Sequence, residues 1–446
     1  MSEDVSTPPR AERRAAPKPA RTPTGGRTTV PSEGGPKGRQ AAMGFIMVVV
    51  LIDMISIGLI IPVLPALVGT FTGSKADQSF WYGAVTLAFA VATFFSSPVL
   101  GSLSDRYGRR PVLLLGFCGL AINFFVTALA SALWMLIAAR FVGGAMQANA
   151  AVAQAYVADV TPPQERARRF GLLGAMFGIG YTLGPVMGGM LGAIDLHLPF
   201  YVAGALAVLN TMYGAFVLPE SLPQDRRQPF QWKRANPVSA LKGLGTLRGV
   251  GPLVWVVGLS GLAQFTMHMS WVLYTTFKFG WGPQENGWSL FAVGVMAAIV
   301  QGGLMKRMLK VMSAQRLAAL GLVSSTACFL AWGLATQGWM MIVIVVCNLF
   351  GFTTVAALQS LISNAADDRE QGQTMGAVAS LNSVTGVVAP VIAAMLLTTV
   401  SGRPPGDVWL GLPFYFCAAL QGLAAFVAIR HFQRQRGTPA AAAAAP

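Results

Sequence analysis

Long apolar runs dominate the pattern of hydrophobic and polar positions along the chain. Each is about as long as the ~20 helical residues that cross a hydrocarbon layer of about 30 Å. A polar segment over 219–251 separates six runs from six others. The predicted spans are 42–69, 80–102, 112–131, 133–158, 168–192, 197–218, 252–276, 287–306, 316–335, 338–363, 374–400 and 408–430. The pattern therefore predicts an all-α polytopic membrane protein with twelve transmembrane helices in two six-helix bundles.

The segments outside the spans have a different composition. Residues 1–40 are rich in Pro, Gly, Ala, Thr and Arg and contain almost no large apolar side chain. Such a segment cannot bury enough surface to fold, so we expect a disordered tail there and at the alanine-rich end. The predicted domains are a cytoplasmic tail (1–40), an N-terminal bundle (41–218), a cytoplasmic linker (219–251), a C-terminal bundle (252–430) and a second tail (431–446).

The composition excludes a soluble globular protein. Of the 446 residues, 54% are apolar and 11% are charged, whereas soluble domains carry about 25% charged residues. The four cysteines lie in apolar segments without metal-ligand spacing, so we expect neither a disulfide nor a metal site. The sequence has no nucleotide-binding motif and no evident nucleophile–base pair. We therefore expect no cofactor, no direct use of ATP and no enzymatic activity.

The net charge of +15 is a signal of membrane orientation. A basic balance is also typical of nucleic-acid-binding proteins. However, 28 of the 32 Lys and Arg residues lie in the two tails and in loops on one side of the predicted membrane. Only Lys75, Lys278 and Arg403 fall on the other side, and Arg140 lies within a span. By the positive-inside rule both termini are cytoplasmic, and the partner is a lipid bilayer rather than nucleic acid.

The two sets of spans repeat each other. Three pairs of residues recur at an offset of 205: Glu165 and Glu370, Gly171 and Gly376, and Pro185 and Pro390. An even number of spans separates the copies, which predicts a parallel repeat related by an axis along the membrane normal. We expect a substrate path at the interface of the two halves.

The loop after the second span carries the pattern G-x-L-x-D-R-x-G-R-R. Gly101 and Gly108 permit a close approach and a tight turn, and Asp105 can meet cations or the positive end of a helix. We predict that Asp105 and Arg109 gate the conformational change. The alternative is a basic loop that serves orientation only.

The fifth span carries glycines at helical spacing. The pattern consists of Gly171, Gly180, Gly184, Pro185, Gly188 and Gly189. Small residues let membrane helices pack closely, and the proline permits a bend. The pattern predicts a pliable face that takes part in the conformational change, or, alternatively, a purely structural packing face.

These motifs resemble signatures of the major facilitator superfamily. The loop pattern is similar to its signature loop, the glycine pattern to that of its proton-coupled drug antiporters, and Arg140 to its buried arginine. Three stretches, 53–65, 155–160 and 358–368, resemble the twelve-helix tetracycline/proton antiporter group. The resemblance spans nearly all of 41–430. It implies the major facilitator fold and proton-coupled export of an amphipathic, drug-like small molecule by alternating access. It also implies a monomer in the bacterial inner membrane.

The chain departs from the tetracycline group at three titratable positions. Asn123 stands about where the group has an acidic residue. The group's later acidic residue and histidine have no counterpart in 316–336 or in 287–306. We therefore expect weak export of tetracycline–metal chelates and a preference for neutral or weakly cationic amphiphiles.

Charged residues within spans are candidates for proton coupling. Asp53 is the only acidic residue well inside a span, where burial costs about 2.5–3.5 kcal/mol on insertion scales. Arg140 is predicted to pair with Asp53 or to act as a fixed charge that changes partner between states. His268 could also titrate. A structural hydrogen-bonded role is the alternative for Asp53, a stability ion pair for Arg140 and a satisfied neutral ring for His268.

Uncharged polar residues inside the spans are predicted to line the substrate cavity. They are Asn123, Gln147, Asn149, Gln154, Gln264, Asn348, Gln359 and Asn382. Each taken alone could instead join two helices by hydrogen bonds.

Two other functions fit the same pattern. A proton symporter that imports a sugar or an organic acid would share the architecture, although the glycine pattern of the fifth span resembles exporters. A receptor or scaffold that does not transport is the second alternative, because fold alone does not determine function. The intact loop around Asp105 and the retained Asp53 and Arg140 favour a transporter.

Overall fold

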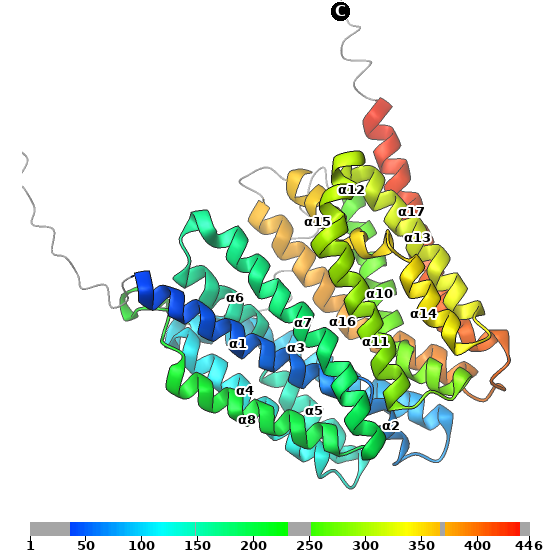
Figure 1. Ribbon diagram of the computed structural model, residues 1–446, viewed down its shortest axis with the longest axis horizontal. Helices are drawn as coiled ribbons and strands as arrows, with labels where there is room; N and C mark the ends of the chain where they lie inside the picture. Colours follow the sequence, from blue (N-terminus) through cyan, green and yellow to red (C-terminus); the bar gives the residue numbers. More distant parts are fainter. Residues whose placement is uncertain (1–35, 148, 231–250, 366–370, 438–446) are drawn as a thin grey trace, which may run out of the picture.

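The computed structural model describes residues 36–147, 149–230, 251–365 and 371–437, and all regular secondary structure among them is helical. Eleven helices in this part of the chain are long and apolar enough to cross a membrane, and one bent pair makes a twelfth. Figure 1 shows them as two bundles that lean against each other. The predicted all-α fold with twelve spans is confirmed.

The N-terminal half contains the first six spans. They are α1 (Pro36–Ile60) with α2 (Leu64–Gly69), α3 (Lys75–Tyr107), α4 (Arg109–Ala128), α5 (Leu133–Ala145) with α6 (Asn149–Val160), α7 (Arg166–Ile194) and α8 (Leu198–Val217). The first span is interrupted between Ile60 and Leu64 because Pro62 and Pro65 do not fit a continuous helix.

The C-terminal half contains the other six spans. They are α10 (Gly251–Phe279), α11 (Pro283–Ile299) continued by a π-helix (Val300–Leu304) and α12 (Met305–Val311), α13 (Ala314–Leu334), α14 (Gly338–Cys347) with α15 (Thr354–Ala365), α16 (Gln371–Val400) and α17 (Leu412–Gly437). Helices α7 and α16 each contain one internal proline, Pro185 and Pro390, in agreement with the repeat at an offset of 205.

Two helix boundaries and two interruptions differ from the hydropathy pattern. Helix α1 begins at Pro36, inside the predicted tail, and α17 continues to Gly437, beyond the predicted limit at 430. The fourth span is interrupted between Ala145 and Asn149. The tenth bends by 56° after Cys347. The remaining residues of both tails, most of the linker and Glu370 lie outside the described residues, so those domain limits stay predictions.

Three clusters of buried hydrophobic residues show how the halves meet. One cluster draws on both halves, from Leu59 to Ala207 and from Ala263 to Ala418, and lies at the end of the bundles far from the chain termini (Figure 1). The other two belong to one half each, within 42–218 and within 253–432, and lie at the end near the termini. The halves therefore share a core at one end and separate at the other, as the ribbon in Figure 1 also shows.

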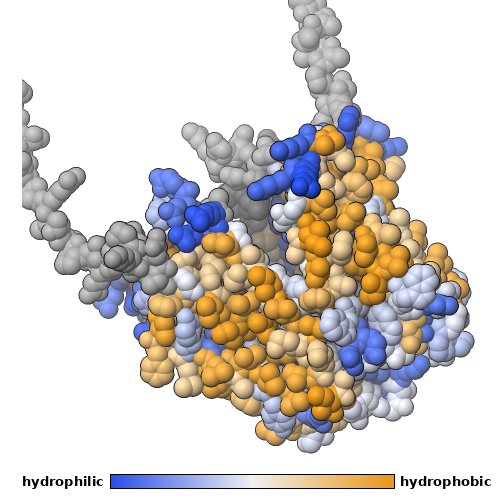
Figure 2. Space-filling view, in the orientation of Figure 1, coloured by the Kyte–Doolittle hydropathy of each residue, from blue (hydrophilic) through white to orange (hydrophobic). Residues whose placement is uncertain are grey.

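The outer surface is suited to lipid. Large apolar side chains face outward from both halves, among them Phe216 at 83% and Trp255 at 71% exposure. Figure 2 shows hydrophobic residues over the sides of both bundles and the most hydrophilic residues gathered mainly near the end that carries the termini. Because apolar surface of this extent is rare on soluble monomers, the distribution supports a multi-pass membrane protein.

Candidate functional site

The glycines of α7 bring it into close contact with α1. A Cβ atom added at Gly184 would lie 2.5 Å from the Cα of Gly58, and one at Gly180 would lie 2.5 Å from the Cβ of Met54. At Gly188 it would collide with the carbonyl oxygen of Leu59. No larger residue fits on this face without moving one of the helices. The predicted close packing of these glycines is therefore present, whereas Gly171 has no such neighbour.

The opposite face of α7 joins the two halves. A Cβ atom added at Gly189 would lie 2.5 Å from the carbonyl oxygen of Pro283, and one at Gly287 would lie 2.5 Å from that of Pro185. A second junction forms between α3 and α16, where Gly83 lies against Ala394. The small residues thus close the halves together at the end far from the termini.

A cavity of about 540 Å³ lies between the halves. Its volume falls within the range of about 300–1,000 Å³ that is typical of sites for drug-sized ligands. The walls come mainly from α1, α3, α4, α5 and α7 of the first half and α10 and α16 of the second. Aromatic side chains make up much of the apolar wall: Tyr82, Phe89, Phe94, Phe124, Tyr181 and Phe265. These aromatic residues could not be identified from the sequence, because aromatic side chains in membrane helices also face lipid and core.

Only two of the eight predicted polar residues line this cavity. Asn123 is 1% exposed and neither atom of its amide has a hydrogen-bond partner, and Gln147 lies at the interruption of the fourth span. The other six are not among the lining residues: Asn149, Gln154, Gln264, Asn348, Gln359 and Asn382. Gln154 and Gln359 are exposed. Asn348 accepts a hydrogen bond of 3.2 Å from Ser324 and belongs to the bend after α14.

Asp53 lies buried beside the cavity rather than in its wall. Its side chain on α1 is 5% exposed. The amide nitrogen of Asn149 donates to its two carboxylate oxygens at 3.2 and 3.4 Å. Asn149 is the first residue of α6, directly after the interruption of the fourth span. The carboxylate is therefore hydrogen-bonded to a residue beside the interruption of that span, where Met146 and Gln147 are not helical.

Arg140 on α5 lines the cavity and does not pair with Asp53. It is 6% exposed, and its Nε and Nη2 atoms are buried without a hydrogen-bond partner. Its guanidinium carbon lies 5.9 Å from the centre of the Phe89 ring. No carboxylate among the described residues lies within ion-pair distance of it. One of its two predicted roles, as the ionic partner of Asp53, is thus not realised in this structure.

His268 on α10 contributes to the same cavity from the second half. Its neighbour in sequence, Met269, also lines the cavity, while Met267 and Trp271 are buried in the shared core. The cavity therefore brings together three of the predicted coupling and binding residues from separate helices: Arg140, Asn123 and His268.

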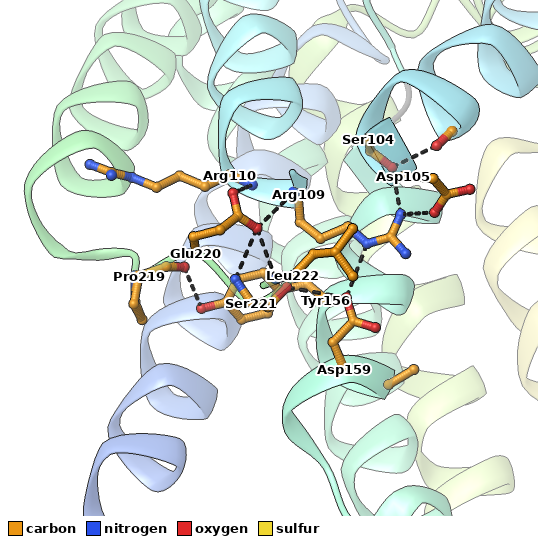
Figure 3. Close-up of polar contacts among 12 residues, drawn as sticks. Ser104, Asp105, Arg109, Arg110, Tyr156, Asp159, Pro219, Glu220, Ser221 and Leu222 are labelled. Atoms are coloured by element: carbon orange, nitrogen blue, oxygen red, sulfur yellow. Dashed lines mark hydrogen bonds and ion pairs between the residues drawn. The ribbon is translucent and has the colours of Figure 1, made fainter. Parts of the chain in front are cut away.

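A network of ionic contacts organises the loop between α3 and α4. Arg109 pairs with Asp105 at 2.5 Å and with Asp159 at 3.0 Å, and it donates to the Ser104 hydroxyl at 2.7 Å. Figure 3 shows Arg109 between these two carboxylates, which come from α3 and α6. All of these partners belong to the N-terminal half. Among the described residues, no ion pair of Asp105 or Arg109 reaches the second half.

Glu220, which follows α8, completes the network. Its carboxylate accepts hydrogen bonds from the backbone nitrogens of Arg109 and Arg110 at 2.8 and 3.2 Å, so it caps the amino-terminal end of α4. It also accepts from the backbone of Ser221 and Leu222 (Figure 3). Sequence reasoning missed this residue because more than a hundred positions separate it from the loop.

Gly108 lies at the turn within this network. Its φ is +109°, a conformation that L-residues with side chains rarely adopt. A Cβ atom there would also collide with the Glu220 carboxylate. The tight turn predicted for Gly108 is therefore present, whereas an added Cβ at Gly101 would meet no atom within 4 Å.

Known proteins share both this sequence pattern and this architecture. Residues 46–390 match the family model described as Major Facilitator Superfamily. The chain is 36% identical over 369 residues to the class C tetracycline resistance protein of Escherichia coli, a match that covers 83% of this chain and 93% of that protein. Several other tetracycline resistance proteins are 30–34% identical to this chain.

Two solved structures resemble the fold. The nucleoside transporter NupG matches with a TM-score of 0.71 at 12% identity, covering 88% of this chain and 99% of that one. The human organic anion transporter MFSD10 (TETRAN) matches with a TM-score of 0.66 at 21% identity, covering 87% and 99%. At these identities the two structures bear on the fold alone.

Proposed function

This chain belongs to the Major Facilitator Superfamily, and on that premise we propose that it exports amphipathic, drug-like compounds in exchange for protons by alternating access. It is a multi-pass membrane transporter of small molecules and not an enzyme. We place it in the bacterial inner membrane as a monomer with both termini in the cytoplasm. The relationship to tetracycline resistance proteins is the observation that carries the proposal.

The arrangement of the halves supports transport by alternating access. The halves separate at the end near the termini and share a core at the other end. With cytoplasmic termini, this conformation admits a compound from the cytoplasm and blocks its return from outside. Rocking about the contacts of α7 with α11 and of α3 with α16, which join the halves, would then open the opposite end.

Asp53 is the proposed carrier of the coupling proton. As a carboxylate it accepts from Asn149; protonation adds an O–H donor and removes the negative charge that strengthens these hydrogen bonds, while an oxygen can still accept. Asn149 lies directly after the interruption of the fourth span. A change of its hydrogen bond with Asp53 can therefore move the neighbouring segment, in which Gln147 lines the cavity. Protonation and the shape of the cavity are thereby linked through two side chains.

A susceptibility panel tests the proposed function. The chain is overexpressed in a host lacking its own efflux pumps, and inhibitory concentrations are measured for amphipathic antibiotics, dyes and tetracycline. We expect protection against at least one amphiphile, weak or no protection against tetracycline, and no protection from Asp53→Asn. Protection against no compound, together with uptake of a labelled nutrient, would reverse the proposed direction.

A further inference from the structure

The proposed function leaves the charge of the substrate open, and the cavity wall bears on it. Among the described residues that line the cavity, Arg140 is the only Lys or Arg, and none is an Asp or Glu. The other polar groups are amides, hydroxyls and the His268 ring. Among these lining residues no carboxylate would compensate the charge of a cationic compound, and only the aromatic faces would attract it.

Among the described residues, Arg140 has no counter-ion. It is 6% exposed, two of its nitrogens are buried without a partner, and its guanidinium lies over the Phe89 ring. An uncompensated charge in an apolar environment is strongly unfavourable. A ligand that brings a negative charge would remove that penalty, and the low polarity of the walls would strengthen the attraction.

The side chains around Arg140 suit a planar anion. A guanidinium binds carboxylates and similar groups through two parallel hydrogen bonds. The amide of Asn123, also unpartnered and lining the cavity, offers a further donor and acceptor. Tyr82, Phe89 and Tyr181 supply aromatic faces for the apolar body of the ligand.

We propose that the cavity selects amphipathic aromatic anions, with Arg140 binding their negative group. This inference rests on the proposed export function and specifies its substrate class. It replaces the preference for weakly cationic amphiphiles expected from the sequence, since the absence of an acid at position 123 leaves Arg140 as the charge that a substrate meets.

A binding experiment with two dyes of opposite charge tests this inference without requiring transport. Fluorescein and rhodamine 123 share the xanthene ring system, but the first is an anion and the second a cation near neutral pH. Binding of each to the purified full-length protein is measured by fluorescence polarisation. We expect tighter binding of fluorescein. Equal or tighter binding of rhodamine 123 would overturn the proposal.

Variants assign the preference to Arg140. Arg140→Gln should weaken fluorescein binding by about tenfold or more, because a charge-assisted hydrogen bond is lost, and Arg140→Lys should restore part of it. Arg403→Gln, the same change at an exposed arginine outside the cavity, should leave it unchanged. Full fluorescein binding by a folded Arg140→Gln would contradict the proposal.

Asn123→Asp keeps the experiment decisive should the arginine variants fail to fold. It has nearly the same size and places a carboxylate in the same wall, so it should shift the preference towards rhodamine 123. An unchanged preference would contradict the proposal.

Transport measurements distinguish a failure of the anion site from a failure of the proposed proton antiport. An anion leaving in exchange for an entering proton moves two charges in the same sense, so a membrane potential should accelerate fluorescein uptake into everted vesicles. Tight fluorescein binding without any proton-dependent transport would refute the proposed antiport and leave the anion site standing. Proton-driven transport of rhodamine 123 but not of fluorescein would support the proposed antiport and refute the anion site.

Discussion

The loop between α3 and α4 of the N-terminal half holds its arginine between two carboxylates, whereas the corresponding segment after α11 in the C-terminal half carries cations alone. Arg109 contacts Asp105 and Asp159. In the other half Lys306, Arg307 and Lys310 on α12 form no ion pair among the described residues. Two copies of one structural plan have thus acquired different electrostatics, and a network in only one copy indicates a specific role rather than a general feature of inner loops.

The interiors of the halves differ in the same way. Asp53 and Arg140 are buried in the first half. In the second half the core near the closed end is aromatic: the rings of Trp271 and Trp332 lie 5.1 Å apart and those of Tyr274 and Phe414 4.5 Å apart. The indole nitrogen of Trp271 donates to Ser289 at 3.0 Å. We infer that the first half carries the proton-coupling charges and the second provides a rigid wall.

The largest effect is expected from substituting one titratable residue in each half. Asp53→Asn should reduce uptake driven by a pH gradient in everted vesicles to the level of vesicles without the protein, because the side chain can no longer gain or lose a proton. His268→Gln should retain most of the uptake. Both are measured with fluorescein and rhodamine 123. Retained uptake by Asp53→Asn, together with loss in His268→Gln, would move coupling to the second half.

The glycine face of α7 tests whether the halves need this close contact to move. Gly189→Ala places a methyl group 2.5 Å from the Pro283 carbonyl oxygen, across the junction of the two halves, and overpacking of this kind costs about 1–3 kcal/mol. We expect a lower midpoint of thermal unfolding and a large loss of transport. Gly174→Ala is the matched control, because no atom lies within 4 Å of its added Cβ. Equal behaviour of the two variants would argue against a role for the contact.

Matched substitutions in the α3–α4 loop and in α12 test whether the ionic network of the first half has a specific role. Arg109→Gln leaves two carboxylates without their cation, and loss of charged hydrogen bonds of this kind costs about 1.5–3 kcal/mol. We expect a lower thermal midpoint and impaired transport. Lys310→Gln, in the loop without ion pairs, should change neither. If both variants behave alike, the network has no specific role.

The smallest effect is expected at the closed end of the second half. Arg403 donates to Asp407 at 2.9 Å, and this hydrogen bond lowers the pKa of that exposed carboxyl. A lowered pKa stabilises the fold above the ordinary value of about 3.9, and the stabilisation is lost as the pH falls through the folded-state pKa. Asp407→Asn should therefore reduce the thermal midpoint slightly near neutral pH and not in strong acid. A shifted pH profile of transport would contradict this local role.

Hydropathy was sufficient to predict the spans because the bilayer fixes their length and composition. It did not predict the interruptions before Asn149 and after Cys347, because hydropathy reports only how apolar a segment is and neither place contains a proline that would mark a break. A residue whose role depends on one local turn, such as Gly108, was also predictable from a short motif.

Contacts between distant segments were not predictable. A polar residue in a membrane helix can face a cavity or bond to a neighbouring helix, and Asn123 and Asn149 took these different roles. Their helices give no periodic signal that distinguishes the two outcomes. Glu220 reached the network from over a hundred residues away, and only the packing of α8 against α4 brings it there.

The proposed exchange of substrate for protons is obligatory. It can be tested by running the exchange in reverse, with a substrate gradient driving proton movement. Purified protein is placed in liposomes at equal internal and external pH, and fluorescein or rhodamine 123 is added outside while an internal pH dye is read. We predict that inward movement of at least one dye drives protons outward, so that the lumen becomes alkaline with wild-type protein and not with Asp53→Asn. Dye entry without any change of internal pH would contradict the account.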